Sequence, residues 1–354
     1  MMRLLAIETS CDETAAAIVE RTADAMRPWA IRSSVVASQV AIHREWGGVV
    51  PELASRQHVR DICGVVERAL LDAGTGWPDI GALAVTQGPG LIGSLLVGVS
   101  FAKAVAWSLG RPLVAVHHLA GHIESIWLDH GRIPLPAVVL VVSGGHTNLY
   151  LVRAEGDYAL LGRTRDDAAG EAYDKVAKLL GLGYPGGPLI DRLWAEGNDR
   201  SIHWPGTRLT NPDRNAPERD ARFDFSFSGL KTAVLRHVRA RQADLGADRL
   251  PDHEIRDIAA SFQRRVVDTL VERTFTAARW HGARSVGIAG GVSANVLLRR
   301  EATARGEALE IPVFIPRVSL STDNAAMIGA AGMRQLERGN LAPPDLNAVA
   351  SLAL

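Results

Sequence analysis

The chain has 354 residues, of which 47% are hydrophobic and 22% charged, and 39 basic side chains balance 39 acidic ones. At about 100–200 residues per domain, the length predicts two or three domains, and the composition excludes a disordered, collagenous or coiled-coil protein. A net charge of zero gives no overall field toward nucleic acid or an anionic membrane, so such binding requires a local patch or a partner.

The ends and the cysteines indicate a cytoplasmic protein. The first ten residues contain only a short apolar run, where a secretory signal needs a longer one and a small-residue cleavage site. Two uncharged stretches, at 80–102 and 133–152, are interrupted by proline and glycine and are not clean membrane spans. Cys11 and Cys63 alone cannot form a disulfide framework. We therefore expect a soluble protein of a reducing compartment with no membrane partner.

The first third of the chain alternates predicted strands and helices. Apolar runs at 4–7 and 15–19 flank the polar segment ETSCDET (8–14), a pattern typical of two strands joined by a hairpin. Helical spacing begins at Pro51 and ends at Gly74. A strand at 82–86, the loop QGPG (87–90), a helix at 93–109 and a strand at 113–116 follow.

The opening pattern returns after Pro134 and Pro136. A strand at 137–142 ends in the turn SGGH (143–146) and returns at 147–152, and a strand at 285–289 ends in GGVS (290–293) before a helix. Three strand–turn units predict two related α/β lobes that face a cleft. Residues 201–221 predict a long surface loop, 325–336 a last helix, and 341–354 a tail that frays.

Several nucleotide and hydrolase motifs are incomplete. GPGLIG (88–93) follows a strand, as a dinucleotide-binding loop does, but the next strand, LVAVHH (113–118), offers no acidic residue for the ribose. GLGYPG (181–186) follows a helix, which is the wrong context, and neither a P-loop nor the elbow G-x-S-x-G is present. A dehydrogenase is therefore the weakest of the functions considered.

His118 and His122 are four residues apart, so on a helix they lie on one face, one turn apart. That geometry suits chelation of one metal ion, although such a pair is also compatible with surface polarity or core hydrogen bonding. A zinc peptidase needs Glu directly after the first His, and residue 119 is Leu. The pair leaves a metal possible but deprives a peptidase of its general base.

The remaining polar positions have two readings each. The turns at 143–146 and 290–291 can hold a phosphate or carboxylate, because glycine lets the backbone approach closely, or they are ordinary turns. Asp12 is either a solvated turn acid or a functional one. Asp166 and Asp167 precede a predicted helix at 168–180 and suit its N-cap, whereas Asp174 within that helix has no such explanation.

Taken together, the motifs resemble one family, the TsaD proteins, from about residue 3 to 338. The blocks that carry the resemblance occur in the family's order: ETSCDET (8–14), QGPG (87–90), HHLAGH (117–122), VSGGHT (142–147), 166–175, YPGGP (184–188), FSFSGLKT (225–232), 289–295 and STDN (321–324). Members of this family were formerly described as O-sialoglycoprotein endopeptidases.

The resemblance implies an α/β fold of two actin/Hsp70/hexokinase-like (ASKHA) lobes with a nucleotide cleft between them. We expect an N-terminal lobe at 1–133, completed by a helix at 324–340, a C-terminal lobe at 134–323 and a tail at 341–354. The implied activity is that of a tRNA N6-adenosine threonylcarbamoyltransferase, an acyltransferase. It moves threonylcarbamoyl from threonylcarbamoyl-AMP to N6 of adenosine 37, 3′ to the anticodon, in tRNAs that read ANN codons.

The family's functional positions transfer residue by residue. One divalent ion, Fe²⁺ or Zn²⁺, is expected on His118, His122 and Asp323. Substrate-binding positions fall on Val142, Ser143, Gly144, Gly145, His146, Asp174, Gly187, Asp191 and Asn295, and Asp12 is the candidate catalytic residue. Implied partners are tRNA and the proteins TsaB and TsaE. The alternatives are a non-catalytic nucleotide-binding scaffold of the same fold and, below it, a metallopeptidase.

Overall fold

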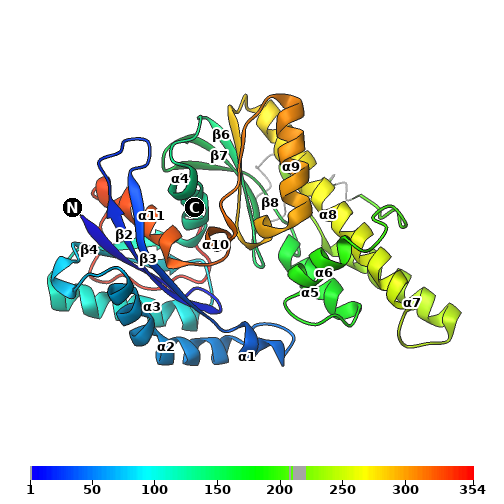
Figure 1. The fold of residues 1–354 in the computed structure, drawn as a ribbon, viewed down its shortest axis with the longest axis horizontal. Helices are drawn as coiled ribbons and strands as arrows, with labels where there is room; N and C mark the ends of the chain where they lie inside the picture. The colour runs from blue at the N-terminus through cyan, green and yellow to red at the C-terminus, as the bar shows by residue number, and fades with distance from the viewer. Residues whose placement is uncertain (1, 207–208, 210–220) are drawn as a thin grey trace. The chain divides into compact units, whose positions relative to one another are not determined.

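The computed structural model of the protein describes residues 2–206, 209 and 221–354 (Figure 1). Contacts within the chain divide it into two compact units: unit 1 is Met1–Ile133 with Pro316–Leu354, and unit 2 is Pro134–Ile315. The lobe limits given above, with a second boundary after residue 323, stay a prediction. Of the predicted loop at 201–221, residues 207–208 and 210–220 lie outside the described part of the chain.

Unit 1 contains one sheet and helices from both ends of the chain. Its elements are β1 (Arg3–Glu8), β2 (Glu13–Arg21), β3 (Trp29–Ser38), α1 (Val40–Arg44), α2 (Pro51–Asp72), η1 (Trp77–Asp79), β4 (Ala82–Gly88), α3 (Ile92–Leu109), β5 (Leu113–His117), α4 (His118–His130), α10 (Val318–Ser321) and α11 (Ala325–Glu337). The sheet order is β3-β2-β1-β4-β5, with β1, β4 and β5 parallel. The predicted hairpin is confirmed as β1 and β2, paired antiparallel from Arg3 opposite Glu20 to Glu8 opposite Ala15.

Alternate residues of the strands face two different helix layers. Leu5 and Ile7 of β1 belong to the core cluster that includes apolar residues of α2 and α3. Leu4 and Ala6 point to the other face, where α11 packs so closely that a Cβ on Gly329 or Gly332 would collide with strand side chains. Figure 1 shows α2 and α3 together on one side of this sheet.

The tail does not fray, and that expectation is wrong. Leu346 and Ala348 are buried in the core of unit 1. Val349 N–H donates to the Gln87 carbonyl at 2.9 Å, and Gly90 N–H donates to the Ala350 carbonyl at 3.1 Å. Backbone hydrogen bonds hold the tail although it has no apolar period, which is why the pattern of the sequence alone missed it. The tail packs on the loop at 87–90, where a Cβ on Gly88 would collide with the Val349 carbonyl oxygen. The glycine of this loop therefore makes room for the tail.

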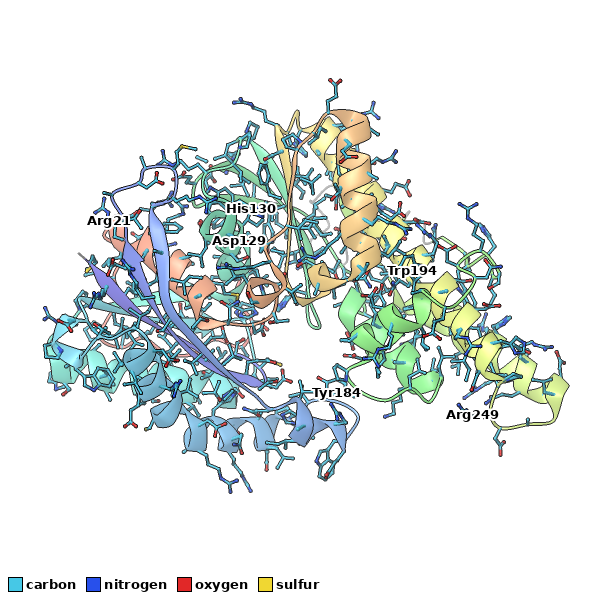
Figure 2. All side chains as sticks on the ribbon, viewed as in Figure 1. Arg21, Asp129, His130, Tyr184, Trp194 and Arg249 are labelled. Carbon is cyan, nitrogen blue, oxygen red and sulfur yellow. The ribbon has the colours of Figure 1, made fainter. Side chains whose placement is uncertain are left out.

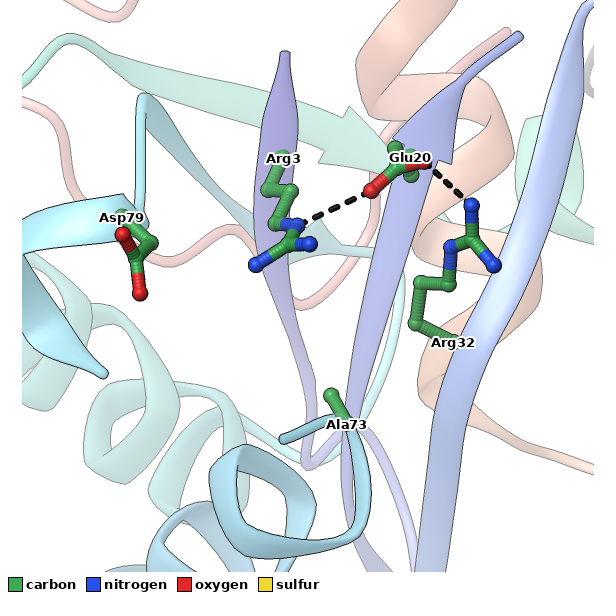
Figure 3. A pocket seen from close by; sticks show the side chains of 5 residues that line it. All are labelled: Arg3, Glu20, Arg32, Ala73 and Asp79. Carbon is green, nitrogen blue, oxygen red and sulfur yellow. Dashed lines mark hydrogen bonds and ion pairs between the residues drawn. The ribbon is translucent and has the colours of Figure 1, made fainter. Parts of the chain in front are cut away.

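A buried carboxylate marks the opposite end of the same sheet. Glu20, 2% exposed, lies between the guanidinium groups of Arg3, at 2.9 Å, and Arg32, at 2.5 Å, in a pocket also lined by Ala73 and Asp79 (Figure 3). The two arginines lower the pKa of Glu20 through their hydrogen bonds. Arg3 begins β1 and Glu8 ends it, so this pocket lies about 17 Å from the carboxyl ends of the parallel strands.

Unit 2 repeats the sheet and adds a helical layer. Its elements are β6 (Ala137–Val142), β7 (Thr147–Ala154), β8 (Asp157–Arg163), α5 (Ala169–Leu179), α6 (Gly186–Trp194), η2 (Ala221–Phe223), α7 (Ser228–Leu245), α8 (Asp252–Trp280), β9 (Ser285–Ala289), η3 (Gly291–Ala294), α9 (Val296–Leu309) and β10 (Val313–Phe314). The sheet order is β10-β9-β6-β7-β8, which is the order of unit 1 with each strand replaced by its counterpart. Two antiparallel pairs and two parallel pairs recur in the same places.

The core of unit 2 lies between its sheet and its helices. Val138, Leu140 and Val142 of β6 pack in one cluster with apolar residues of α5, α7, α8 and α9. The helices α7 and α8 were not predicted, because charged residues interrupt their apolar spacing. The repeated sheet confirms the two related α/β lobes inferred from the recurring strand–turn pattern.

One helix among the described residues, α3, is long and apolar enough to cross a membrane by length and composition. It packs against β4 and α2, and 33% of the helix is buried.

Candidate functional site

The carboxyl ends of the three parallel strands of unit 1 bring polar side chains together. Glu8 is the last residue of β1, Thr86 lies near the end of β4, and His118 begins α4 directly after β5. Ligand sites of open α/β sheets form at these strand ends, since the loops and helix starts converge there. The candidate site therefore lies at the carboxyl ends of β1, β4 and β5, which run parallel.

Three side chains form a cluster of metal-ligand type at this edge. Ligand atoms of His118, His122 and Asp323 all lie within 4.8 Å of one another. Asp323 Oδ1 is 3.2 Å from His122 Nε2 and 3.6 Å from His118 Nε2. The two imidazoles share one face of α4, as their spacing requires, and meet edge to face with ring centroids 4.8 Å apart.

The His122 imidazole tests whether a metal suits this cluster. His122 is fully buried, and among the described residues neither ring nitrogen makes a hydrogen bond: Nε2 only faces Asp323 Oδ1 at 3.2 Å, and Nδ1 has no polar contact of this kind. A buried polar atom without a partner is costly, so an imidazole held in this way indicates a ligand that the protein itself does not supply. Two imidazoles and one carboxylate are a common donor set for Zn²⁺ and Fe²⁺, and they leave coordination positions open. The residues fit a divalent metal ion.

A carboxylate that the sequence analysis did not single out contacts the first of these histidines. Glu8, 0% exposed, accepts hydrogen bonds from Thr86 Oγ1 at 2.6 Å and from the Ser10 N–H, and its Oε2 lies 3.1 Å from His118 Nδ1. Burial acts to lower the pKa of His118, but the Asp323 and Glu8 carboxylates outweigh it and raise that pKa to about 9. Burial likewise acts to raise the pKa of Glu8, and His118 reverses the effect and lowers it.

The helix that follows Asp323 is fixed to the helix that carries the histidines. Arg334 of α11 and Glu124 of α4 form an ion pair buried almost completely, with Nη2 2.8 Å from Oε2. A Cβ on Gly121 of α4 would lie 2.8 Å from Ile328 Cδ1 and 3.2 Å from Met327 Cγ, so the two helices pack closely at this glycine. Asp129, near the end of α4 (Figure 2), accepts from the Arg317 N–H at 2.7 Å. These contacts bring residue 323 to residues about 200 positions earlier.

The turn after β1 carries the candidate catalytic residue. Asp12 is 8% exposed and lies between Cys11 and Glu13. Burial, the negative charges of Asp12 and Asp323, and a hydrogen bond with Asp12 raise the pKa of Glu13 to about 10, so Glu13 is protonated at neutral pH. Burial and the same acids raise the pKa of the Cys11 thiol, which keeps it from acting as a thiolate.

A buried histidine supports this turn from α2. His58 Nε2 donates to the Cys11 carbonyl at 3.0 Å, and its Nδ1 accepts from Thr14 Oγ1 at 2.7 Å. Burial lowers the pKa of His58, and the bond to the Cys11 carbonyl only partly offsets that. The neutral ring thus has one donor and one acceptor, and both are satisfied.

In unit 2 the turn at 143–146 leaves its backbone accessible. Gly144 and Gly145 are exposed, and a Cβ on either would meet nothing within 4 Å. The turn is closed by the Ser143 N–H, which donates to the His146 carbonyl at 2.8 Å, and it begins directly after Val142, the buried last residue of β6. Gly170 of α5 packs on the turn, where a Cβ would lie 2.6 Å from the Ser143 carbonyl oxygen.

Two of the predicted nucleoside-binding residues of unit 2, Asp174 and Asp191, accept hydrogen bonds from the first N–H groups of α6 and α9. Asp174 accepts from the Gly186 N–H at 2.7 Å, next to Gly187, whose Cβ position is open space. Asp191 accepts from Gln263 Nε2 at 2.8 Å and from the Val296 N–H at 3.1 Å. Asn295 donates to Gln263 Oε1 at 2.8 Å. Gln263, fully buried on α8, joins the last two positions, and nothing in its sequence context marks it.

The acidic pair before α5 does not cap that helix, which corrects one reading of the sequence. The Asp166 carboxylate accepts from the N–H groups of Phe227 and Ser228 and from the Ser226 and Ser228 hydroxyls, so it caps α7. Asp167 instead binds Lys175 at 2.7 Å and Lys231 at 3.0 Å. The FSFSGLKT segment is thus held by a tertiary contact across about 60 residues.

The fold and the site define a class. Two α/β units with the same five-stranded sheet order, and a His-His-Asp cluster at the strand ends of one of them, are an ASKHA-type protein with a candidate metal centre. The solved structure of full-length HypF in the phosphate- and nucleotide-bound form has this fold, with a TM-score of 0.58 and 13% identity over 95% of this chain and 46% of that one.

The chain belongs to the TsaD family. The family model described as tRNA N6-adenosine threonylcarbamoyltransferase matches residues 30–330. A relative with this name from Moorella thermoacetica is 51% identical over 99% of this chain and 97% of its own length. One from Anaeromyxobacter dehalogenans is 52% identical over 98% of both chains. The predicted family, its transferase class and the ASKHA fold are confirmed, and neither the scaffold nor the peptidase reading is favoured.

Proposed function

We propose that the chain transfers threonylcarbamoyl from threonylcarbamoyl-AMP to N6 of adenosine 37 in tRNAs that read ANN codons. Membership of the TsaD family over most of the chain carries this proposal. The donor is a mixed anhydride and is already activated, so no covalent enzyme intermediate is required. The exocyclic N6 attacks the carbamoyl carbon, the bond from that carbon to the phosphate oxygen breaks, AMP leaves, and N6 loses a proton.

The nucleotide part of the donor is assigned to unit 2. The open backbone at Val142, Ser143, Gly144, Gly145 and His146 suits a phosphate, because exposed N–H groups of glycine approach an anion without steric hindrance. Asp174 and Asp191 suit ribose hydroxyls, and Gly187 leaves room beside them. Each carboxylate already accepts backbone or amide hydrogen bonds, but its oxygens have about four acceptor sites, so capacity remains for a hydroxyl.

Asn295 is the candidate for the adenine edge. Its Oδ1 accepts from the Leu298 N–H at 2.9 Å and its Nδ2 donates to Gln263, which fixes the plane of the amide. One N–H and one acceptor position of the amide then remain for a base. A fixed amide recognises a planar partner at a lower entropic cost than a mobile one.

A divalent ion, Fe²⁺ or Zn²⁺, is assigned to His118, His122 and Asp323. When bound there, such an ion supplies Lewis acidity toward donor oxygens that gain negative charge during transfer. Within the described structure neither ring nitrogen of His122 makes a hydrogen bond, and its Nε2 faces Asp323 Oδ1 at 3.2 Å; that observation supports the assignment most directly.

Asp12 is assigned the proton that leaves N6. Burial and the neighbouring acids raise the pKa of Glu13 to about 10, which makes Glu13 a poor proton acceptor at neutral pH and leaves Asp12 as the candidate in this turn. The turn that carries Asp12 is held by the bond from His58 to Cys11, which limits its movement. The cytoplasm is the assigned compartment, and TsaB and TsaE are the assigned protein partners.

The test is a transfer assay with the purified chain, its two partners, ATP, unmodified tRNA and threonylcarbamoyl-AMP supplied as the donor, followed by nucleoside analysis. We expect threonylcarbamoyladenosine only with the complete mixture. Asp12→Ala should reduce turnover while affinity for a non-hydrolysable threonylcarbamoyl-AMP analogue stays within about twofold. Wild-type turnover by that variant would show that Asp12 is only a solvated turn acid, and no product with the wild type would contradict the proposed activity.

A further inference from the structure

We propose that Glu8 is a positioning residue, which fixes the His118 imidazole with its proton on Nδ1 and its Nε2 lone pair toward the ion. The inference rests on the metal site proposed above and concerns a residue that makes no proposed contact with metal or substrate. Glu8 ends β1, and its side chain points to the first residue of α4 across the sheet edge.

Hydrogen-bond donors surround the Glu8 carboxylate, so both of its oxygens act as acceptors. It is fully buried, and its Oε1 accepts from the Ser10 N–H while its Oε2 accepts from Thr86 Oγ1 at 2.6 Å. The third donor that faces this carboxylate is His118 Nδ1, 3.1 Å from Oε2. A carboxylate buried without a cation or a set of donors is costly, so these three donors account for its presence.

A second group competes for the same nitrogen and must be weighed. Ser10 Oγ lies 3.2 Å from His118 Nδ1, close to the Glu8 distance. A carboxylate is the stronger acceptor, since hydrogen bonds to an ionised group are about twice as strong as those between neutral groups. Ser10 is also tied to Glu8 through its own backbone N–H. The hydroxyl is therefore expected to assist, and Glu8 to decide the tautomer.

The tautomer matters because a neutral imidazole binds a metal through the nitrogen that has no proton. A proton held on Nδ1 leaves Nε2, the atom nearer Asp323, as the ligand. A carboxylate partner also makes the ring a better donor, and removal of such a partner from a metal-bound histidine typically costs about 10–100-fold in affinity. Glu8 would thus act on the ion through His118.

Glu8→Gln gives the most direct test, because it keeps the shape of the side chain but replaces one of the two acceptor oxygens with an NH₂ donor. With the amide oxygen toward Ser10, the amide NH₂ faces His118 Nδ1 and forces the proton to Nε2, where it competes with the metal. With the amide reversed, the NH₂ faces the Ser10 N–H, and two donors meet in a buried position. Either orientation weakens the site, and we expect Zn²⁺ affinity, measured by competition with a chelating dye, to fall about 10–100-fold.

The matched control is Ser10→Ala, which removes the competing hydroxyl from the same nitrogen. We expect its Zn²⁺ affinity to stay within about threefold of wild type. Equal affinities for Glu8→Gln and wild type, or a larger loss in Ser10→Ala than in Glu8→Gln, would overturn the assignment of Glu8. A wild-type protein that binds no Zn²⁺ would instead contradict the proposed metal site, so the two failures are distinguishable.

A measurement on the wild type covers the case in which Glu8→Gln does not fold. In the zinc-loaded full chain, with histidines labelled with ¹⁵N, the ring nitrogens of His118 report where the proton and the metal are. We expect a protonated Nδ1 and a metal-bound Nε2, assigned by comparison with His118→Ala. A protonated Nε2, or metal on Nδ1, would refute the inference whatever the stability of the variant.

Discussion

The two units have the same sheet order, but the ends of their corresponding strands carry different chemistry. After β1 of unit 1 the turn holds acids, and the ends of β4 and β5 add Thr86 and the first histidine of α4. After β6 of unit 2 the corresponding turn holds two exposed glycines, with no Cβ contact within 4 Å. In unit 1 side chains converge, whereas in unit 2 the backbone is left accessible.

The comparison shows that the fold fixes where a site forms and the local residues fix what it binds. Carboxyl ends of parallel strands converge in both units because the sheet order is repeated. Imidazoles and carboxylates at those ends suit a cation, and bare N–H groups suit an anion. The tail strengthens the contrast, because it covers the loop at 87–90 after β4 of unit 1.

The largest expected effect is loss of the ion from unit 1. His122→Ala should bring metal content, measured by elemental analysis, from about one ion per chain to background. Only two ligands then remain, His118 at the start of α4 and Asp323 before α11. His130→Ala, at the end of the same helix, is the matched control and should keep its metal. Full occupancy in His118→Ala, His122→Ala and Asp323→Ala alike would refute the cluster.

The next effect concerns stability. Glu124→Ala leaves Arg334 buried without its carboxylate, and breaking such a pair from one side costs about 3–5 kcal/mol. In unit 2, Arg153→Ala breaks the pair with Asp157, whose side chains are 58% and 44% exposed, and should cost about 0–1 kcal/mol. Urea unfolding of both variants gives the difference, and equal midpoints would show that α4 and α11 do not depend on this contact.

A smaller effect is expected in the nucleotide site of unit 2. Asp174→Ala and Asp191→Ala each remove charge-assisted hydrogen bonds worth about 1.5–3 kcal/mol, so affinity for an adenylate analogue should fall about one to two decades. Titration calorimetry measures this, and metal content should be unchanged. Glu307→Ala, an exposed acid on α9, is the control. An Asp174→Ala variant with wild-type affinity would show that the nucleoside is misplaced.

The smallest effect is the pH dependence contributed by His58. Its folded pKa lies below the unfolded value near 6.5, so below that pH the unfolded chain binds more protons and the folded protein loses stability. One such group contributes a slope of at most about 1.4 kcal/mol per pH unit, and nothing above about pH 7.5. His58→Gln should flatten the stability profile of the metal-free protein below pH 6.5. An unchanged profile would mean that folding does not lower the pKa of His58.

Much of unit 1 followed from local pattern. Continuous apolar runs identified β1, β2 and β4, and Gly110 marked the end of α3, where its φ of 59° requires a residue tolerant of the left-handed region. The pair His118 and His122 was placed on one helix face by spacing alone. Residue identity, through the resemblance to TsaD proteins, added Asp323, which no local rule connects to that helix.

The tertiary structure decided what depends on contacts between distant segments. Glu8, Gln263 and Asp166 acquire their roles from partners about 60 to 110 residues away along the chain. The tail lacks an apolar period, which predicts a loose segment, yet the loop at 87–90 forms backbone hydrogen bonds with it. Periodicity and turn chemistry act over a few residues, so the sequence by itself determined the family, the strands that are apolar runs and the longer helices of unit 1, whereas β3, β8 and β10 were not predicted. Which polar groups meet at the strand ends was decided only by packing the sheet, since burial leaves each polar atom dependent on whatever partner the fold brings near.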